Sequence, residues 1–270
     1  MITVIDCCPL CGSNKSKPTV HPLYCECLSC KVVYQCKEIH QIEDYYDKTQ
    51  APPNCINQSK TYRSYLKVVD HFIDLKKPQS IIDVGAADGT FLNLVHELYP
   101  GGRTFAIEHS EQAKTVLRKQ GIALLEVTDL VDVKSKCIFS FQVLEHISEP
   151  IEFINSLHLA PGDYLILTSP AVDSVFFARN QSHWRSYSPS YHLLLYSKTS
   201  LKYLLDQCHL ALLYYDFCYS RSHTYNRITS YIQHIKNQLI WTGSVCAHGY
   251  SPRPWYHGRS SFLAIAQKNQ

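Results

Sequence analysis

The sequence predicts an α/β protein whose main domain is a doubly wound parallel β-sheet, preceded by a small cysteine-rich module. From residue 80 onward, short apolar runs alternate with helical stretches, which is the pattern of repeated βαβ units. Residues 81–90 read as a buried strand that ends in a small-residue turn and opens a helix. Seven of the 12 cysteines lie between Cys7 and Cys36, which sets that segment apart from the rest.

Length and composition restrict the protein classes. The 270 residues suffice for one domain or two, and 45% hydrophobic residues supply a sizeable core. The N-terminus lacks the basic start and apolar centre of a secretory signal, and no apolar run approaches the roughly 18 residues of a membrane span. We therefore expect a soluble, cytoplasmic protein with no membrane contact. A formal net charge of +3 is small for this length and does not indicate a nucleic-acid partner.

Two CxxC pairs, Cys8 with Cys11 and Cys27 with Cys30, are separated by 15 residues. Each pair turns the backbone so that two thiolates point at one ion, and two pairs supply the four sulfurs that structural zinc prefers. We predict a zinc ribbon over residues 1–38 with these four ligands. An iron–sulfur or redox role is the alternative, but a redox CxxC belongs on an α/β fold, and neither pair lies on one.

The expected zinc ion is structural. Four thiolates leave no coordination position for water or substrate, so the ion would hold the fold together without doing chemistry. Cys7, Cys25 and Cys36 compete for ligand status, but their spacing is poorer. Lys15 and Lys17 are too sparse to form a persuasive phosphate-binding face, so we expect a lid or docking module for the domain that follows.

The elements after the ribbon follow in order. Residues 39–58 contain Pro52 and Pro53 and are expected to form a linker. Apolar residues return at helical spacing from 59 to 76, and Pro78 marks the stop. The alternation then predicts strands at about 80–84, 103–107, 123–127, 137–142 and 163–168, and helices at 89–98, 110–120, 149–159 and 198–207. In such a sheet, ligands bind at the carboxyl ends of the strands.

The first strand ends in a turn suited to a nucleoside-bearing cofactor. Gly85 and Gly89 permit positive φ and close backbone approach, and the helix that begins near Gly89 offers its amide groups to a polar ligand. Asp83 and Asp88 would repel a pyrophosphate and favour a cofactor with an ammonium group and hydroxyls. Glu108 ends the next strand, where an acid accepts hydrogen bonds from both ribose hydroxyls.

Over almost its whole length, the chain resembles a class I S-adenosylmethionine-dependent methyltransferase with an N-terminal zinc ribbon. The CPxCG knuckle and the glycine turn at 83–89 are similar to that family's motifs, as are the second-strand stretch 107–113 and the fourth-strand stretch 141–150. The resemblance implies a Rossmann-like, seven-stranded sheet with an antiparallel last strand, in a methyltransferase domain at 59–270. It implies S-adenosylmethionine as cofactor.

The resemblance also implies which residues contact the cofactor. Asp83, Gly85 and Asp88 would line its methionine end. The ribose would lie at Glu108. The other residues implied at the cofactor are Ala87, Gly89, Gln142 and Val143.

The family usually has glycine where this chain has Ala87, and the added methyl group narrows the backbone conformations available to the turn. Asp129 follows the third strand and is the candidate to accept a hydrogen bond from the adenine amino group.

Methyl transfer from a sulfonium is an in-line displacement, so the protein supplies alignment, a dry site and removal of the acceptor's proton. Histidine suits the last task because its unperturbed pKa is about 6.5. His146 follows the fourth strand and is a candidate base, with capping of the next helix as the alternative. His192 resembles the histidine of an HLYYFS-like element in the family and is a candidate base or substrate ligand, with aromatic packing as the alternative. His183 and Trp184 are expected to shape the pocket.

The C-terminal part should complete the sheet. We expect antiparallel strands near 210–217 and 261–267, with an insertion at about 220–258 between them. The insertion should contain a helix at about 225–241 with one apolar face. This helix could cover the acceptor pocket, pair with a second copy in a homodimer, or simply pack on its own domain.

Three functions remain open at this point. The first is methylation of a small molecule, foremost at an oxygen of a sugar, glycan or secondary metabolite. The second is methylation of RNA gripped by the ribbon. The low net charge argues against it, as does Phe141-Gln142-Val143-Leu144 where an Asn-Pro-Pro-Tyr type motif would stand. The third is a non-catalytic adaptor, against which the intact cofactor motifs argue.

Overall fold

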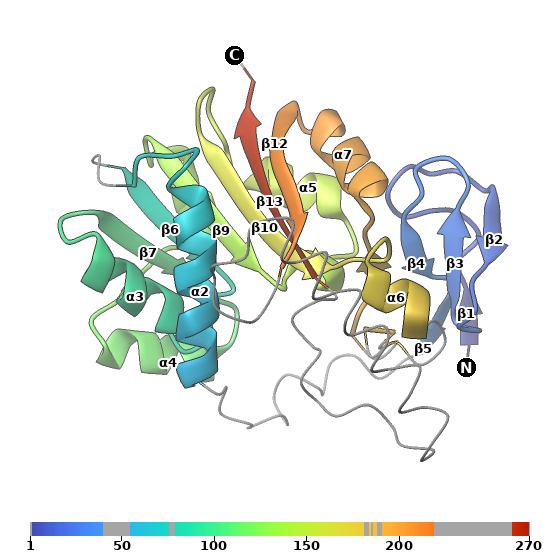
Figure 1. Cartoon of the computed structure of the whole chain (residues 1–270), viewed down its shortest axis with the longest axis horizontal. Helices are drawn as coiled ribbons and strands as arrows, with labels where there is room; N and C mark the ends of the chain where they lie inside the picture. The colour runs from blue at the N-terminus through green and yellow to red at the C-terminus, as the bar shows by residue number, and fades with distance from the viewer. Residues whose placement is uncertain are drawn as a thin grey trace, which may run out of the picture.

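The computed structural model describes residues 2–39, 55–75, 79–180, 184, 186–187, 191–218 and 261–269 (Figure 1). Some predictions fall wholly or mostly outside these residues: the linker at 39–58, the role of His183, and the insertion at 220–258 with its helix at 225–241. Within the described part, no helix is both long enough and apolar enough to span a lipid bilayer.

The main domain contains a seven-stranded sheet. Its strands are β6 (Ser80–Val84), β7 (Arg103–Ile107), β8 (Ala123–Leu124), β9 (Lys136–Phe141), β10 (Tyr164–Pro170), β12 (Leu210–Phe217) and β13 (Ser261–Lys268). Their order across the sheet is β12-β13-β10-β9-β6-β7-β8. Strands β8, β7, β6, β9 and β10 pair in parallel, whereas β13 is antiparallel to both β10 and β12. The predicted Rossmann-like sheet with an antiparallel last strand is confirmed.

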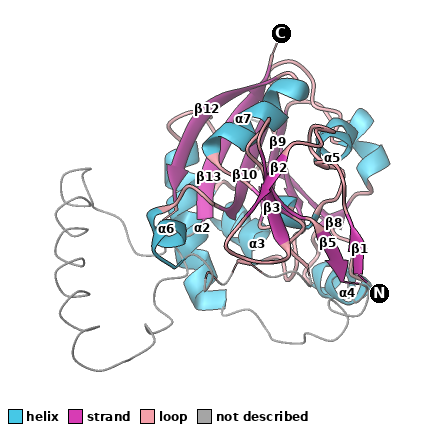
Figure 2. Ribbon diagram, turned by 90° about the vertical axis from the view of Figure 1, so that its right-hand side faces the viewer, coloured by secondary structure: helices cyan, strands magenta, loops and turns pink. Residues whose placement is uncertain are grey.

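Helices cover both faces of this sheet (Figures 1 and 2). They are α2 (Cys55–Val69), α3 (Thr90–Leu98), α4 (Glu111–Lys119), α5 (Pro150–Ser156), α6 (Val175–Asn180) and α7 (Lys198–Gln207). The neighbours Ile81 and Ile82 of β6 are both fully buried, yet they belong to different core clusters. Ile81 packs with residues of α2 and α3, and Ile82 with residues of α5 and α7. A strand buried on both faces explains the unbroken apolar run in the sequence.

Several predicted elements differ from the structure in extent, among them α5, which ends at Ser156 and not at residue 159, and two differences have a local explanation. Strand β8 covers only Ala123–Leu124, because the chain then enters a 3₁₀ helix, η1 (Val127–Val131), in which Asp129 Oδ2 accepts a hydrogen bond of 2.8 Å from the Glu126 amide. Helix α2 spans Cys55–Val69, so it begins inside the predicted linker and ends before residue 76. The next residue, Asp70, accepts a 2.6 Å hydrogen bond from the Tyr99 hydroxyl.

The cysteine-rich segment forms two small sheets. Strand β1 (Ile2–Val4) pairs with β5 (Lys37–Ile39). Strands β2 (Ser16–Pro18), β3 (Tyr24–Cys27) and β4 (Val33–Gln35) form a second sheet. Its outer strand is β11 (Leu194–Leu195), which comes from the main domain between β10 and α7. The ribbon and the main domain therefore share one sheet.

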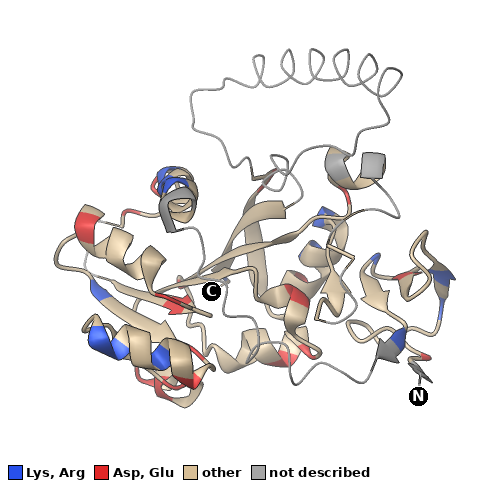
Figure 3. Ribbon diagram, turned by 90° about the horizontal axis from the view of Figure 1, so that it is seen from below, with Lys and Arg blue, Asp and Glu red and all other residues tan. Residues whose placement is uncertain are grey.

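Charged residues are dispersed. Figure 3 shows basic and acidic positions spread over several elements, including α4 and the ribbon, with the two signs interspersed. This distribution agrees with the small net charge of +3.

Candidate cofactor and acceptor site

The turn after β6 touches the segment after β9. Gly85 has φ of +80°, and a Cβ placed there would lie 2.6 Å from Val143 Cγ2. Glycine is therefore required at Gly85 both by its backbone conformation and by the neighbouring side chain. The two residues that the sequence assigned to one cofactor site do lie together.

Gly89 has a different explanation. It also has positive φ, +77°, but its missing Cβ would meet Ile122 Cδ1 at 2.6 Å and Leu117 Cδ2 at 2.9 Å. These atoms belong to α4 and the residues after it, so close packing of the turn against that segment already demands a glycine. Gly89 is the N-cap residue of α3 but has no side chain that could accept a capping hydrogen bond. The preceding residue supplies one, because Asp88 Oδ1 accepts a 3.0 Å hydrogen bond from the Thr90 amide.

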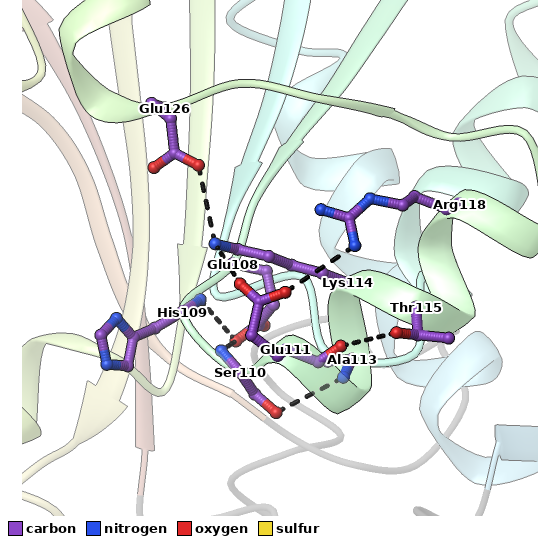
Figure 4. A network of polar contacts seen from close by, with 9 residues as sticks. All are labelled: Glu108, His109, Ser110, Glu111, Ala113, Lys114, Thr115, Arg118 and Glu126. Carbon is purple, nitrogen blue, oxygen red and sulfur yellow. Dashed lines mark hydrogen bonds and ion pairs between the residues drawn. The ribbon is translucent and has the colours of Figure 1, made fainter.

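Glu108 is held by backbone amides (Figure 4). Its Oε1 accepts hydrogen bonds from the amides of His109 at 2.8 Å and Ser110 at 2.9 Å, and its Oε2 accepts one from the amide of Ala87 at 2.8 Å. Ala87 has φ of +47°, so it adopts the left-handed conformation although it carries a methyl group. A carboxylate has about four acceptor positions, and three are in use. Binding both ribose hydroxyls would require one amide, such as that of Ala87, to release Glu108.

The helix α4 that follows is fixed at its start and side (Figure 4). Ser110 caps it by accepting a 3.4 Å hydrogen bond from the Ala113 amide. Lys114 forms ion pairs with Glu111 at 3.0 Å and Glu126 at 3.6 Å, which join the helix to the segment after β8.

Asp83 is buried, with 3% of its surface exposed. Burial raises the pKa of its carboxyl group to about 8, and the negative charges of Glu108 and Asp88 act in the same direction. Three acids, from β6, from the turn after it and from the end of β7, create a negative potential that suits a cationic ligand.

Tyr62 of α2 also interacts electrostatically with Asp83 and Asp88, which the helical spacing of residues 59–76 did not reveal. Burial raises the pKa of its hydroxyl, and the charges of Asp83 and Asp88 raise it further. Its ring stacks on Phe141, at the end of β9, with 5.1 Å between centroids. A tyrosine on the apolar face of a helix that precedes the glycine turn was the available signal.

Gln142 and Asp129 have local partners. Gln142 has φ of +56°, its amide donates to the Thr168 carbonyl at 2.9 Å, and its Nε2 donates to Thr168 Oγ1 at 3.1 Å. These bonds tie the end of β9 to β10. Asp129 is exposed and accepts the Glu126 amide described above, which gives it a local capping role.

The two predicted catalytic histidines lie together. His146 belongs to a 3₁₀ helix, η2 (Leu144–His146), and its ring centroid is 5.0 Å from that of His192. His146 Nδ1 lies 2.8 Å from the Tyr191 carbonyl oxygen, and His192 Nδ1 lies 2.8 Å from that of Ser186. Burial lowers the pKa of both rings, that of His192 to about 4. Neutral imidazoles can accept a proton or bind a metal ion.

Glu145 completes this group, and sequence reasoning did not single it out as a site residue. Its side chain is 1% exposed, and burial raises its pKa to about 8. Its ligand atoms and those of His146 and His192 all lie within 4.8 Å of one another. We call these three residues the Glu-His-His cluster.

Trp184 is 2% exposed, and its ring lies edge-on to Phe177 of α6 at 5.0 Å and to Tyr187 at 5.5 Å. His21 of the ribbon stacks on Tyr187, with 5.0 Å between centroids. Trp184 thus belongs to an aromatic group that joins the acceptor segment to the ribbon.

The four predicted zinc ligands converge. Sγ atoms of Cys8, Cys11, Cys27 and Cys30 all lie within 4.8 Å of one another. Cys8 and Cys30 are 3.6 Å apart, and Cys11 and Cys27 are 3.5 Å apart. A tetrahedral zinc ion bound at about 2.3 Å from each sulfur would separate them by about 3.8 Å, so this donor set fits zinc.

Comparison with known proteins bears on the whole arrangement. A family model described as a methyltransferase domain matches residues 58–214, which is more than half of the chain. Comparison with curated proteins found no match.

One solved structure shows the same fold, and two others are reported as similar to this chain. A chain from a Haloferax volcanii complex of the Trm112 methyltransferase activator with a methyltransferase shares 12% identity, with a TM-score of 0.53 over 80% of this chain and 95% of that one. An Archaeoglobus fulgidus S-adenosylmethionine-dependent methyltransferase shares 14%, with a TM-score of 0.48 over 77% and 94%. The plantazolicin methyltransferase BpumL, with a substrate analogue and S-adenosylhomocysteine, shares 18%, with a TM-score of 0.49 over 85% and 90%. On the strength of the family model, the chain belongs to the methyltransferase-domain family and is an S-adenosylmethionine-dependent methyltransferase.

Proposed function

We propose that this enzyme methylates an oxygen atom of a small molecule of the sugar, glycan or secondary-metabolite class. The observation that carries the proposal is the pairing of His146 with His192, whose ring centroids lie 5.0 Å apart at the carboxyl end of the sheet. His146 follows Val143 by one helical turn, and Val143 touches the cofactor turn at Gly85. This proximity supports the proposal that His146 and His192 handle the acceptor's proton beside the methyl donor.

For the cofactor we propose the contacts that the sequence and the family resemblance imply. Asp83 and Asp88 would hold the ammonium group, and Glu108 the ribose. The remaining proposed contacts are Gly85, Ala87, Gly89, Asp129, Gln142 and Val143. When bound, S-adenosylmethionine supplies an electrophilic methyl group on a sulfonium. Close contact of Gly85 with Val143 joins the turn to the segment after β9, which supports a cofactor site formed by both segments.

The chain's own groups would prepare the acceptor. An alcohol is a weak nucleophile until its proton is shared or removed, and neutral imidazoles can accept it. Both histidines are oriented by backbone carbonyl groups, so neither ring has to reorganise on binding. The dispersed charge in Figure 3 supports an acceptor other than a polyanion.

The ribbon would support this site from outside. We propose that residues 1–38 hold a structural zinc ion on Cys8, Cys11, Cys27 and Cys30, and that residues 59–270 form the catalytic domain. The Tyr24 hydroxyl of the ribbon donates to the His192 carbonyl at 2.7 Å, and the Gln35 amide donates to the Leu193 carbonyl at 2.9 Å. These bonds fix the backbone that carries His192.

Release of S-adenosylhomocysteine tests the proposal. The purified enzyme is incubated with labelled cofactor and either a panel of sugars, nucleotide sugars and phenols or bulk RNA. We expect turnover on a small hydroxylated acceptor, reduced about a hundredfold or more in His146→Ala and His192→Ala. The exposed His96→Ala on α3 is the matched control and should keep full activity. Label in RNA, or equal turnover in all three variants, would contradict the proposal.

A further inference from the structure

The Glu-His-His cluster contains a buried carboxylate with no cationic partner among the described residues. Glu145 is 1% exposed, and neither of its side-chain oxygens has a hydrogen bond of good geometry to a described residue, although the Ser169 side chain is near enough to lower its pKa. No lysine or arginine in the described part forms an ion pair with it. An isolated buried carboxylate is unfavourable, so such groups are neutral, paired, or bound to a metal ion.

The two histidines are arranged as metal-binding histidines are. A histidine that binds a metal through one ring nitrogen commonly donates the other N–H to a backbone carbonyl, which fixes the tautomer and the ring orientation. His146 Nδ1 lies 2.8 Å from the Tyr191 carbonyl oxygen, and His192 Nδ1 lies 2.8 Å from that of Ser186. This pattern assigns the proton to Nδ1 and the lone pair to Nε2 in His192, whereas the His146 ring also interacts with the Gln142 backbone.

The backbone fixes the cluster in place. Glu145 and His146 come from η2, and the Glu145 carbonyl accepts a 2.7 Å hydrogen bond from the Leu193 amide, next to His192. The Tyr24 hydroxyl of the ribbon binds the His192 carbonyl from the other side. All three side chains therefore offer one ligand atom to a common point, within 4.8 Å of one another.

We propose that Glu145, His146 and His192 bind a divalent transition-metal ion of the zinc class, as a second metal site separate from the four cysteines. Two imidazoles and one carboxylate are a donor set that such ions favour over Mg²⁺ or Ca²⁺, which prefer oxygen ligands. Three protein ligands leave a coordination position for an oxygen of water or of another molecule.

The role of this ion rests on the proposed function. In O-methylation, a hydroxyl bound at the open position has a lowered pKa and loses its proton to solvent. Its oxygen then forms the C–O bond to the methyl carbon while the C–S bond of the sulfonium breaks and the thioether leaves. With the ion bound, metal activation of the hydroxyl replaces direct proton transfer to His146 and His192, which then act as metal ligands and position the acceptor through the ion.

Metal stoichiometry tests the binding site without reference to activity. The full-length protein is equilibrated with Zn²⁺, freed of loosely bound metal by gel filtration, and measured by plasma mass spectrometry. We expect two zinc equivalents in the wild type and one in Glu145→Gln and in His192→Ala. The exposed Glu149→Gln, four residues from Glu145, is the matched control and should keep two. Far-ultraviolet circular dichroism and S-adenosylmethionine binding verify that each variant is folded.

Cobalt distinguishes the two sites in one sample. Co²⁺ on four thiolates gives a strong sulfur-to-metal charge-transfer band, whereas Co²⁺ on imidazole and carboxylate gives only weak d–d bands. Glu145→Gln should lose the weak bands and keep the charge-transfer band. The proposal is overturned if wild-type protein with loaded cysteines takes up no second equivalent of Zn²⁺ or Co²⁺, or if Glu145→Gln retains it. Metal binding without methyl transfer would contradict the proposed function but not the proposed metal site.

Discussion

Replacing Gly85 by alanine tests the contact between the cofactor turn and the segment after β9. The variant adds a methyl group 2.6 Å from Val143 Cγ2, at a residue with φ of +80°. The left-handed conformation costs an L-residue about 1–2 kcal/mol. Overpacking costs about 1–3 kcal/mol more, so Gly85→Ala should lower the free energy of unfolding by roughly 2–5 kcal/mol. That is a large part of the about 5–15 kcal/mol that stabilises a typical domain.

Urea denaturation in two backgrounds separates the two costs. In a Val143→Ala background the clash is removed, so Gly85→Ala should cost about 1–3 kcal/mol less than in the wild type. Gly121→Ala is the matched control, because its φ is +73° and nothing lies within 4 Å of the added methyl group. Gly121→Ala should lower the free energy of unfolding only by the cost of the left-handed conformation. An equal cost of Gly85→Ala in both backgrounds, or a cost no greater than that of Gly121→Ala, would refute the reasoning.

Three further predictions concern the cofactor site and the ribbon. Asp83 has a pKa of about 8 in the cofactor-free protein, so binding of a cationic cofactor should release its proton. The affinity for the cofactor should therefore rise about tenfold per pH unit between about pH 6 and pH 8. Calorimetry should show this slope in the wild type and a flat profile in Asp83→Asn, and equal slopes would remove Asp83 from the cofactor contact. Tyr62→Phe keeps the stacking on Phe141 but removes the hydroxyl that interacts electrostatically with Asp83 and Asp88. Cofactor affinity should therefore fall about threefold to tenfold, with stability changed by less than about 1 kcal/mol. Unchanged affinity would mean that the Tyr62 hydroxyl has no role in cofactor binding. Cys11→Ser should lose zinc and free β11 from β4, so turnover should be abolished while cofactor affinity stays within about threefold. The variant Cys7→Ser changes an exposed cysteine and should behave as wild type. A zinc-free variant with full turnover would contradict the supporting role of the ribbon.

Local pattern was sufficient for most of the main sheet. The bounds of β6 at Ser80–Val84 and of α7 at Lys198–Gln207 agree with the prediction, because each apolar run is short and is bounded by turn or capping residues. Ser197 illustrates this, since it caps α7 by accepting a 3.2 Å hydrogen bond from the Ser200 amide. The overlong prediction for β8 has a local cause too, since Leu125 continues the apolar run but the hydrogen bond between Glu126 and Asp129 ends the strand.

Features that depend on distant segments could not be predicted. Strand β11 has only two residues and exists because β4, about 160 residues earlier in the chain, pairs with it. Glu145 appears in sequence as part of a familiar motif, and only the fold shows that it is buried beside His192. Tyr62 belongs to a helical apolar pattern in the sequence, and only the fold shows its electrostatic interaction with Asp83 and Asp88. In each case the information lies in tertiary packing, which overrides local propensity.

Calorimetric titration of the metal-quantified protein with S-adenosylmethionine tests the central claim most directly. Asp83→Ala and Glu108→Ala are titrated alongside, with zinc content as the control for folding of the ribbon. The account predicts binding at about micromolar concentration in the wild type and its loss in both variants. A folded, zinc-loaded wild type that binds no S-adenosylmethionine would contradict the assignment of this site, and with it the catalytic function.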